Sequence, residues 1–361
     1  MNKEIRRYID SMRLKEEGSF RFSKNANTTI LSSSFALSTL YLLEGGAIAE
    51  EYIDSKTYLR TQRTEKGYFL DKNFIAEDTT GSHKQEYILS QFTYFTMIAL
   101  DMLGDSVPGL PFVDEKYGNQ AKLEEWIRAQ DFSRFWYSSN ELMFVLYFLS
   151  YILKYSQKNH KDEAEQQLQL FFSILNSKQD PETGYWGTDL NNGNLLDGCY
   201  GSAHIYLFYD YYKREIPYVK QIIVNTLTLH AENGLLGNKY GGACEDYDAI
   251  DIYLRCMKQT DYRKGDVVNM LEKMRKVIGE SQHRNGGFPY RISQNSIRRS
   301  FKIAMKRSYM YSGWTKMETI AYEPDLWATW FRSLSLKVID YMIDEKDEFY
   351  SYHLPAWGYI R

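Results

Sequence analysis

The chain has 361 residues, of which 43% are hydrophobic and 25% charged, a balance typical of a globular protein with a large core and not of a disordered chain. Its formal net charge of −3 offers no global field for a nucleic acid or an anionic membrane, and no apolar run reaches the roughly 20 residues that cross a bilayer. Only three cysteines are present, and the amphipathic start lacks an apolar signal core. These features predict a cytoplasmic protein without a transmembrane segment.

A short motif recurs along the chain, in which a Gln or Glu is followed by a Gly and then by aromatic or apolar residues. Copies begin at Gln62, Gln179, Glu232 and Gln282, and a degenerate copy begins at Gln130. The repeating unit is about fifty residues long, enough for two helices and two turns. The longer first interval contains the Pro-rich and Gly-rich segment 108–117, which predicts an inserted loop.

Two classes of helix alternate around this motif. Charged amphipathic helices precede it, as over 161–176, 219–230 and 266–282. Helices that are apolar on nearly every side follow it, and we expect them at 28–43, 83–103, 138–153, 199–212, 244–257 and 323–336. Such helices must be surrounded by others, so the six predict an inner ring inside an outer amphipathic ring. The predicted fold is all-α, an (α/α)6 toroid of six helical hairpins in one domain over residues 1–361.

The inner helices of such a toroid run the same way, and their first turns meet at the mouth of one pocket. The aromatic content of 16%, with 31 tyrosines, suits a pocket for sugars, prenyl chains or carbocations. Polar residues at these positions also cap helices, which is the structural alternative for Ser139 and Asp325. The expected substrate-binding residues are Tyr200, His204, Tyr247, His83, Glu86, Tyr322 and Trp327.

The densest acidic cluster contains Glu245, Asp246, Asp248 and Asp251. Four carboxylates this close repel one another, and enclosure would raise the pKa of at least one of them. A carboxyl that is held protonated can act as a general acid. We therefore interpret these four residues as the catalytic cluster, with simple helix capping as the alternative.

A second constellation places Asp197 two positions before Cys199. A carboxylate and a thiol at this spacing can bind zinc if His204 or the segment 244–248 supplies a further ligand. The structural alternative is that Cys199 is a small core residue and that His204 is a satisfied core histidine. A third pair, His83 and Glu86, lies one helical turn apart and could serve in acid/base chemistry or as ligands.

From Gln62 to Leu336 the repeat resembles that of the squalene cyclases and of the β subunits of protein prenyltransferases. The segment 196–200 is similar to the prenyltransferase segment whose Asp and Cys bind zinc. The resemblance implies zinc ligands Asp197, Cys199 and Asp248, the last in place of the family's histidine. The family's diphosphate-binding basic residues have no counterparts before Asp197, so protein prenylation is not expected.

The segment 246–249 also resembles the Asp-x-Asp-Asp motif of class II terpene cyclases, which protonates an alkene or an epoxide. Ala249 stands where that family has its last aspartate. The resemblance implies that Asp248 is the acid and that Asp246 and Asp251 tune it.

The first functional hypothesis is therefore an enzyme similar to terpene cyclases and prenyltransferases. It would act on an isoprenoid or lipid-like substrate by acid or metal-assisted chemistry in a central aromatic pocket, and its small size implies a short substrate or a partner subunit. The second is a carbohydrate-active hydrolase, lyase or epimerase that pairs Asp248 with Glu86 or Asp325. The third is a non-catalytic toroid that binds a protein or a lipid. Whether the segments 108–117 and 298–307 cover the pocket stays open.

Overall fold

The computed structural model describes residues 2–71, 74, 85–188, 193–292, 307–308, 318–319, 322–344 and 352–360. Regular structure in this part of the chain is helical apart from two short antiparallel strand pairs, β1–β2 and β3–β4. The chain forms two compact units, each assembled from three separate stretches. Unit 1 contains Met1–Ser106, Ala231–Tyr247 and Glu272–Tyr350, and unit 2 contains Val107–His230, Asp248–Leu271 and Ser351–Arg361.

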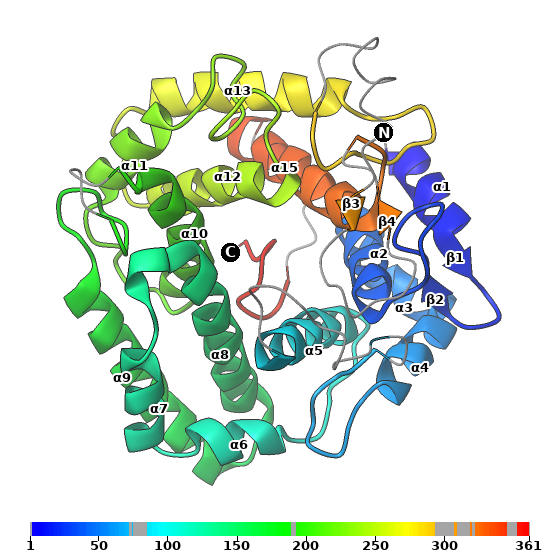
Figure 1. Ribbon diagram of the computed structural model, residues 1–361, viewed down its shortest axis with the longest axis horizontal. Coiled ribbons are helices and arrows are strands. Elements are labelled where there is room, and N and C mark those ends of the chain that lie inside the picture. Colours follow the sequence, from blue (N-terminus) through cyan, green and yellow to red (C-terminus); the bar gives the residue numbers. More distant parts are fainter. Residues whose placement is uncertain are drawn as a thin grey trace. The chain divides into compact units, whose positions relative to one another are not determined.

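Unit 1 is built around three apolar helices, α2, α5 and α15, with α2 packed between the other two (Figure 1). Phe35 of α2 contacts Phe95 of α5 at 4.9 Å and Trp330 of α15 at 5.3 Å between ring centroids. Helix α2 begins with a capping box between Thr29 and Ser32. The elements of unit 1 are α1 (Asn2–Met12), β1 (Arg13–Leu14), β2 (Ser19–Phe20), α2 (Ile30–Glu44), η1 (Gly45–Ala47), α3 (Ile48–Glu51), α4 (Ile53–Thr61), α5 (Gln85–Met102), β3 (Arg307–Ser308), β4 (Glu318–Thr319) and α15 (Leu326–Asp344).

Unit 2 is centred on helix α8, which packs against both α9 and α10. Trp186 is fully buried here, and its indole N–H donates to the Leu175 carbonyl at 2.8 Å. The elements of unit 2 are α6 (Pro111–Tyr117), α7 (Gln120–Arg128), η3 (Phe132–Arg134), α8 (Phe135–Tyr155), α9 (Lys158–Lys178), α10 (Leu195–Tyr211) and α11 (Val219–Thr228).

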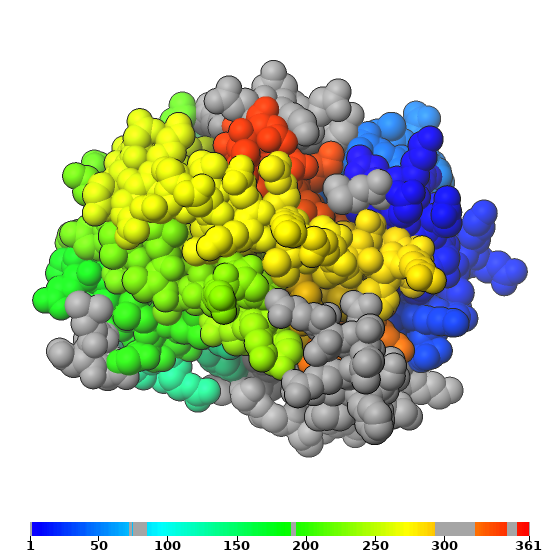
Figure 2. All heavy atoms as spheres, turned by 90° about the horizontal axis from the view of Figure 1, so that it is seen from above, coloured from blue at the N-terminus to red at the C-terminus, as the bar shows by residue number. Residues whose placement is uncertain are grey.

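Two further helices contribute residues to both units, namely α12 (Ala243–Met257) and α13 (Lys264–Glu280). Helix α13 buries Val267, Leu271, Met274 and Ile278 at helical spacing. Its remaining positions are mostly exposed, and the helix lies on the surface in Figure 2, where it is yellow. This is the amphipathic class of helix predicted from the sequence.

All six predicted apolar helices are present, with ends shifted by at most eight residues from the predicted ones. The predicted inserted loop at 108–117 is wrong in part, because Pro111–Tyr117 forms helix α6 with its proline at the first helical position. Proline is well suited there, since its missing N–H would have no partner within the helix.

The segment 298–306 and His83 lie outside the described residues. No helix in the described part of the chain is long and apolar enough to cross a membrane.

The sequence repeat corresponds to a repeated turn. Five copies have a glycine with a positive φ between +66° and +99°, a conformation that side chains disfavour. These glycines are Gly18, Gly67, Gly184, Gly234 and Gly286. The copy at Gly18 was not among those recognised in the sequence.

Each turn is attached to the apolar helix that follows it. The second residue after the glycine donates its backbone N–H to a side-chain oxygen on that helix at 2.7–3.3 Å. The five donor and acceptor pairs are Phe20 and Ser33, Phe69 and Thr93, Trp186 and Ser202, Leu236 and Asp246, and Phe288 and Thr329. These acceptors fix a common register for helices α2, α5, α10, α12 and α15.

The close approach of α8 and α10 generates a prediction about stability. A Cβ at Gly201 of α10 would lie 2.5 Å from a ring carbon of Phe135 and 2.8 Å from its backbone carbonyl carbon. We expect Gly201→Ala to lower the free energy of unfolding by about 1 to 3 kcal/mol, since backbone atoms cannot move aside cheaply. Urea denaturation followed by circular dichroism measures the change.

The matched control is Gly279→Ala in α13, where an added Cβ would meet nothing within 4 Å. This variant should be neutral or more stable by about 0.5 to 1 kcal/mol, since alanine favours a helix over glycine. Equal stability of the two variants would contradict the described packing of α8 on α10.

Candidate functional site

The common register shows which residues are unusual for their position. Two residues beyond the acceptor, helices α2, α5 and α15 carry Phe35, Phe95 and Phe331, which are all buried among aromatic rings. At the same position α10 carries His204 and α12 carries Asp248. The fold thus places two titratable side chains where the other copies of the repeat place phenylalanine.

His204 and Asp248 face each other inside unit 2. The Nε2 atom of His204 lies 4.0 Å from Oδ1 of Asp248, and the two side chains are only 3% and 2% exposed. On the other side of the imidazole, Nδ1 lies 2.8 Å from the hydroxyl of Ser139 on α8. Burial lowers the pKa of His204 to about 3, so the imidazole is neutral at physiological pH.

The hydrogen bonds around Ser139 favour one tautomer of this histidine. The Ser139 hydroxyl donates to the Trp136 carbonyl at 3.1 Å, which leaves its oxygen to accept from Nδ1–H of His204. The lone pair of Nε2 then faces Asp248. In this arrangement the imidazole is a proton acceptor opposite a buried carboxyl group, which is suited to acid/base chemistry.

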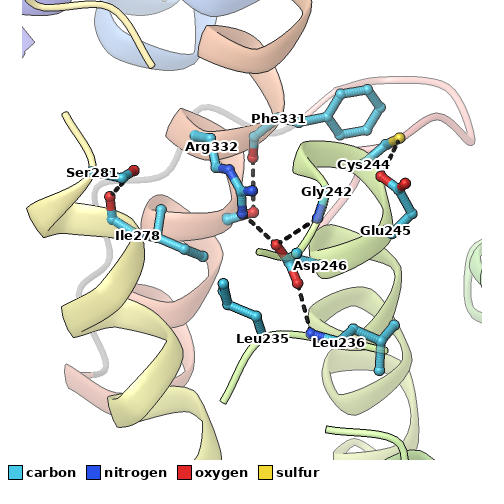
Figure 3. A network of polar contacts seen from close by, with 12 residues as sticks. Leu235, Leu236, Gly242, Cys244, Glu245, Asp246, Ile278, Ser281, Phe331 and Arg332 are labelled. Atoms are coloured by element: carbon cyan, nitrogen blue, oxygen red, sulfur yellow. Dashed lines mark hydrogen bonds and ion pairs between the residues drawn. The ribbon is translucent and has the colours of Figure 1, made fainter. Parts of the chain in front are cut away.

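Asp246 has a different environment, in unit 1 (Figure 3). One carboxylate oxygen accepts from the Leu236 amide at 2.7 Å, and the other accepts from the Gly242 amide at 3.2 Å and from Arg332 at 2.6 Å. Both charged side chains are fully buried. Burial raises the pKa of Asp246, and the Arg332 cation opposes this rise. Because the other copies use a hydroxyl at this position, Asp246 is the turn-fixing acceptor of its repeat.

Asp251 pairs with Arg255 one helical turn further along α12. Its carboxylate accepts from Arg255 Nη2 at 2.8 Å, and neither side chain is exposed. The same guanidinium donates to Asp210 of α10 at 2.5 Å, and Lys258 donates to the same Asp210 oxygen at 2.7 Å. These contacts form a charge-compensated ion network in unit 2.

Glu245 accepts hydrogen bonds from its own set of partners in unit 1. The Tyr290 hydroxyl approaches both carboxylate oxygens, at 2.6 and 2.7 Å. The Cys244 thiol donates to the same group at 3.1 Å, and Arg291 Nη2 lies 3.6 Å from it. Cys244, Tyr290 and Arg291 are each partly exposed, while Glu245 is buried. A phenol bound to a buried carboxylate beside a guanidinium can donate or accept a proton.

The four carboxylates are therefore separated by their partners. The pKa of Asp246 is raised, as expected for one carboxyl of the cluster. Burial is the largest cause of this rise, and the charge of the neighbouring Glu245 has a smaller effect. Mutual repulsion is thus a minor influence on Asp246, because each acidic side chain faces its own donor or histidine.

The residues proposed as zinc ligands do not fit a metal. Among the described residues no group of three or more His, Cys, Asp and Glu side chains could hold a metal ion, and Asp197, Cys199 and Asp248 are all described. Asp197 instead accepts from the Trp136 amide at 3.2 Å. Burial raises the pKa of the Cys199 thiol to about 12.

The residues expected to bind substrate are distributed between the two units. In unit 2, Tyr200 packs on Trp136 with ring centroids 4.7 Å apart, and His204 is the histidine described above. In unit 1, Tyr247 and Trp327 pack on Phe331 at 6.0 and 5.2 Å, while Glu86 is exposed at the start of α5 and Tyr322 is partly exposed. His83 cannot be placed, since it lies outside the described residues.

The roles of five residues in these arrangements were not recognised in the sequence. Tyr290, Arg291 and Arg332 were overlooked because their partners are remote in the chain, and no local pattern marks them. Ser139 is expected at the pocket mouth, with helix capping as the alternative, but the sequence does not predict its contact with His204. Trp357, whose ring lies 5.2 Å from that of His204, belongs to a segment without helical or strand pattern.

Comparison with known proteins identifies the fold. No family model and no curated protein matches the chain. A solved polysaccharide lyase matches with a TM-score of 0.50 and 10% identity, over 94% of this chain and 98% of the lyase chain. A type II terpene cyclase from Scytonema, in complex with its substrate geranylgeranyl dihydroxybenzoate, matches with a TM-score of 0.52 and 11% identity, over 95% of this chain and 96% of the cyclase chain. The chain therefore has the α/α toroid fold predicted from its repeat.

Asp325, at the start of α15, provides a prediction about pH. Burial raises its pKa to about 7, although its side chain accepts from the Ala328 amide at 2.7 Å. A carboxyl with a folded-state pKa above its unfolded value stabilises the fold below pH ~4 and loses this contribution as the pH rises to about 7. The loss should be on the order of 4 kcal/mol, since each pKa unit corresponds to about 1.4 kcal/mol.

The asparagine in Asp325→Asn keeps an oxygen for the Ala328 amide but cannot ionise. We expect the stability of the wild type relative to this variant to fall between about pH 4 and pH 7 in urea denaturation. Asp266→Asn changes an exposed position of α13, so its free energy of unfolding should follow that of the wild type over the same pH range. A difference between wild type and Asp325→Asn that is constant with pH would contradict the assigned burial.

Proposed function

We propose that the chain is an enzyme in which Asp248 is a general acid and His204 is its partner. The observation that supports this most directly is the approach of a neutral, buried imidazole to the buried Asp248 carboxyl at 4.0 Å. Asp246 and Asp251 are bound to buried arginines, which hold both side chains in position. Asp248 faces an uncharged group that accepts a proton.

The protonated state of Asp248 fits this environment in physical terms. Burial disfavours a negative charge on a carboxyl, and the imidazole that faces Asp248 is neutral. A carboxylic O–H directed at Nε2 would keep the carboxyl oriented. Transfer of this proton to a carbon–carbon double bond would leave a carboxylate, and proton loss from the resulting cation would restore the acid. The net reaction is an isomerisation or cyclisation.

An isoprenoid or another alkene-bearing lipid is the proposed substrate class. Aromatic rings line the neighbourhood of the pair, with Trp357 against His204 and Trp136 against Tyr200. Ring faces stabilise cations and exclude water that would quench them. The matched terpene cyclase, solved with geranylgeranyl dihydroxybenzoate, supports the same class by its fold and ligand.

The remaining parts of the proposal concern organisation and location. We take residues 1–361 as one functional domain, with a partner subunit if the substrate is long. The three cysteines are free thiols, which supports a reducing cytoplasmic compartment.

Substitution of the proposed acid is the first test. We would incubate the protein in D2O with polyprenyl alkenes, their epoxides and geranylgeranyl dihydroxybenzoate, and detect isomerised products by mass spectrometry. The wild type should introduce one deuterium per protonated carbon. Asp248→Asn should lower turnover at least about 100-fold, the usual contribution of a general acid.

Asp266→Asn is the control, because this aspartate is exposed and pairs only at the surface with Arg263. It should keep wild-type turnover. Full activity in Asp248→Asn would refute the role of Asp248, and no turnover by any protein together with unchanged lipid binding would favour a non-catalytic toroid.

A second candidate function, elimination in an acidic glycan, rests on the Glu245, Tyr290 and Arg291 arrangement. A phenol paired with a carboxylate can remove or return a proton beside a sugar carboxylate, and a guanidinium can neutralise that carboxylate. The matched polysaccharide lyase supports this class by its fold. The candidate stands beside the pairing of Asp248 with Glu86 or Asp325 that the sequence indicates for a carbohydrate-active enzyme.

The lyase hypothesis predicts that Tyr290→Phe abolishes the formation of unsaturated products from uronate-containing polysaccharides. The loss should be about 100-fold or more, because the ring remains and only the proton-transfer group is removed. Ultraviolet absorbance of the new double bond measures it. Asp248→Asn should retain this activity, so the two variants separate the two candidate functions.

A further inference from the structure

The segment 352–360 packs on His204 in unit 2, on the helix that carries one member of the His204 and Asp248 pair. It contains neither helix nor strand, yet most of its side chains are buried. Trp357 is 3% exposed, and its ring centroid lies 5.2 Å from that of His204 at an interplanar angle of 58°. An indole therefore rests on the imidazole that faces the proposed acid.

The same segment continues along α10. The ring of Tyr359 lies 5.0 Å from the ring of Tyr211, and the guanidinium of Arg255 lies 6.0 Å from the Tyr359 ring centroid. His204 and Tyr211 are two helical turns apart, a distance of about 10 Å along the axis. The segment thus follows α10 from the His204 pair to the buried ion network. Figure 1 shows it, in red, beside α10.

We propose that the segment 352–360 is a displaceable internal cover of the His204 and Asp248 site. Burial of apolar and aromatic side chains supplies much of its stabilisation, and it forms no helix or sheet ladder whose cooperative unfolding would have to accompany its release. Local opening of such a segment requires less free energy than global unfolding. Opening exposes the pair, and closure excludes water from it.

The chemistry of the cover indicates what can replace it. The space against His204 accepts a flat apolar group, the indole of Trp357, next to an aromatic phenol at Tyr359. An apolar chain with unsaturated carbons has the same preference for these surfaces. The inference that an isoprenoid displaces the cover rests on the proposed function, whereas the opening itself does not.

The opening is tested by the reactivity of His204 toward diethyl pyrocarbonate, followed by peptide mass spectrometry. The imidazole is neutral, so exposure limits its reaction. His353, in the same segment but exposed, gives the rate of an accessible histidine in the same sample. We expect His204 in the wild type to react at a rate that does not change at low urea concentrations, as in local opening. A rate that follows global unfolding at every urea concentration would overturn the proposal.

Three variants of the full chain refine this test. Trp357→Ala should raise the rate at His204 at least about tenfold, because it removes a large buried ring from the cover. Trp357→Phe should stay within about twofold of the wild type, since it keeps an aromatic ring. His353→Ala, which changes an exposed side chain, should leave the rate unchanged. If Trp357→Ala does not fold, the urea dependence of the wild type still decides the question.

Hydrogen exchange tests the occupant separately. Addition of geranylgeraniol should increase amide exchange in residues 354–360 of the wild type while slowing the reaction of His204, as expected for replacement of one cover by another. Local opening without any response to geranylgeraniol would uphold the cover and contradict the isoprenoid assignment. The proposed cover would be contradicted if amide exchange in residues 354–360 increased while the reaction of His204 followed global unfolding at every urea concentration.

Discussion

Helix α12 must bring four carboxylates into the protein interior, and this constraint organises the candidate sites. A buried carboxylate is costly unless a hydrogen bond or a cation compensates it. The structure meets the requirement separately for each one: Tyr290 binds Glu245, Arg332 binds Asp246, Arg255 binds Asp251, and His204 faces Asp248. Two of these partners are cations and one is a phenol donor. Asp248 differs because the group that faces it is a neutral imidazole.

The repeat explains how this difference arises within a regular fold. Five glycine turns donate a backbone N–H to the next apolar helix and so give these helices one register. In that register Asp246 replaces a serine or threonine, while His204 and Asp248 replace phenylalanine. Asp246 keeps the hydrogen bond from the turn, which the Leu236 amide donates, and also pairs with Arg332. The second replacement places two buried titratable groups at a position that phenylalanine occupies in three other copies of the repeat.

Periodicity was sufficient to predict the fold class and the six apolar helices, because helix burial depends on local composition at 3.6-residue spacing. It also indicated the acidic segment of α12. It could not assign roles to Asp246 and Asp251, since Arg332 lies far along the chain and the orientation of α12 was unknown. The common register of the apolar helices could not be predicted from the sequence. The number of residues between the turn glycine and the acceptor differs greatly among the copies, as a comparison of Gly234–Asp246 with Gly286–Thr329 shows. The zinc site, inferred from the resemblance of segment 196–200, is not supported, because the described residues contain no group of three or more suitable ligands.

The central claim is that Asp248 holds a proton opposite His204. The most direct measurement is the 13C chemical shift of the Asp248 carboxyl carbon in aspartate-labelled protein, assigned by comparison with Asp248→Asn. The account predicts a protonated carboxyl at the pH of the activity assay. An ionised Asp248 carboxylate at that pH would contradict it.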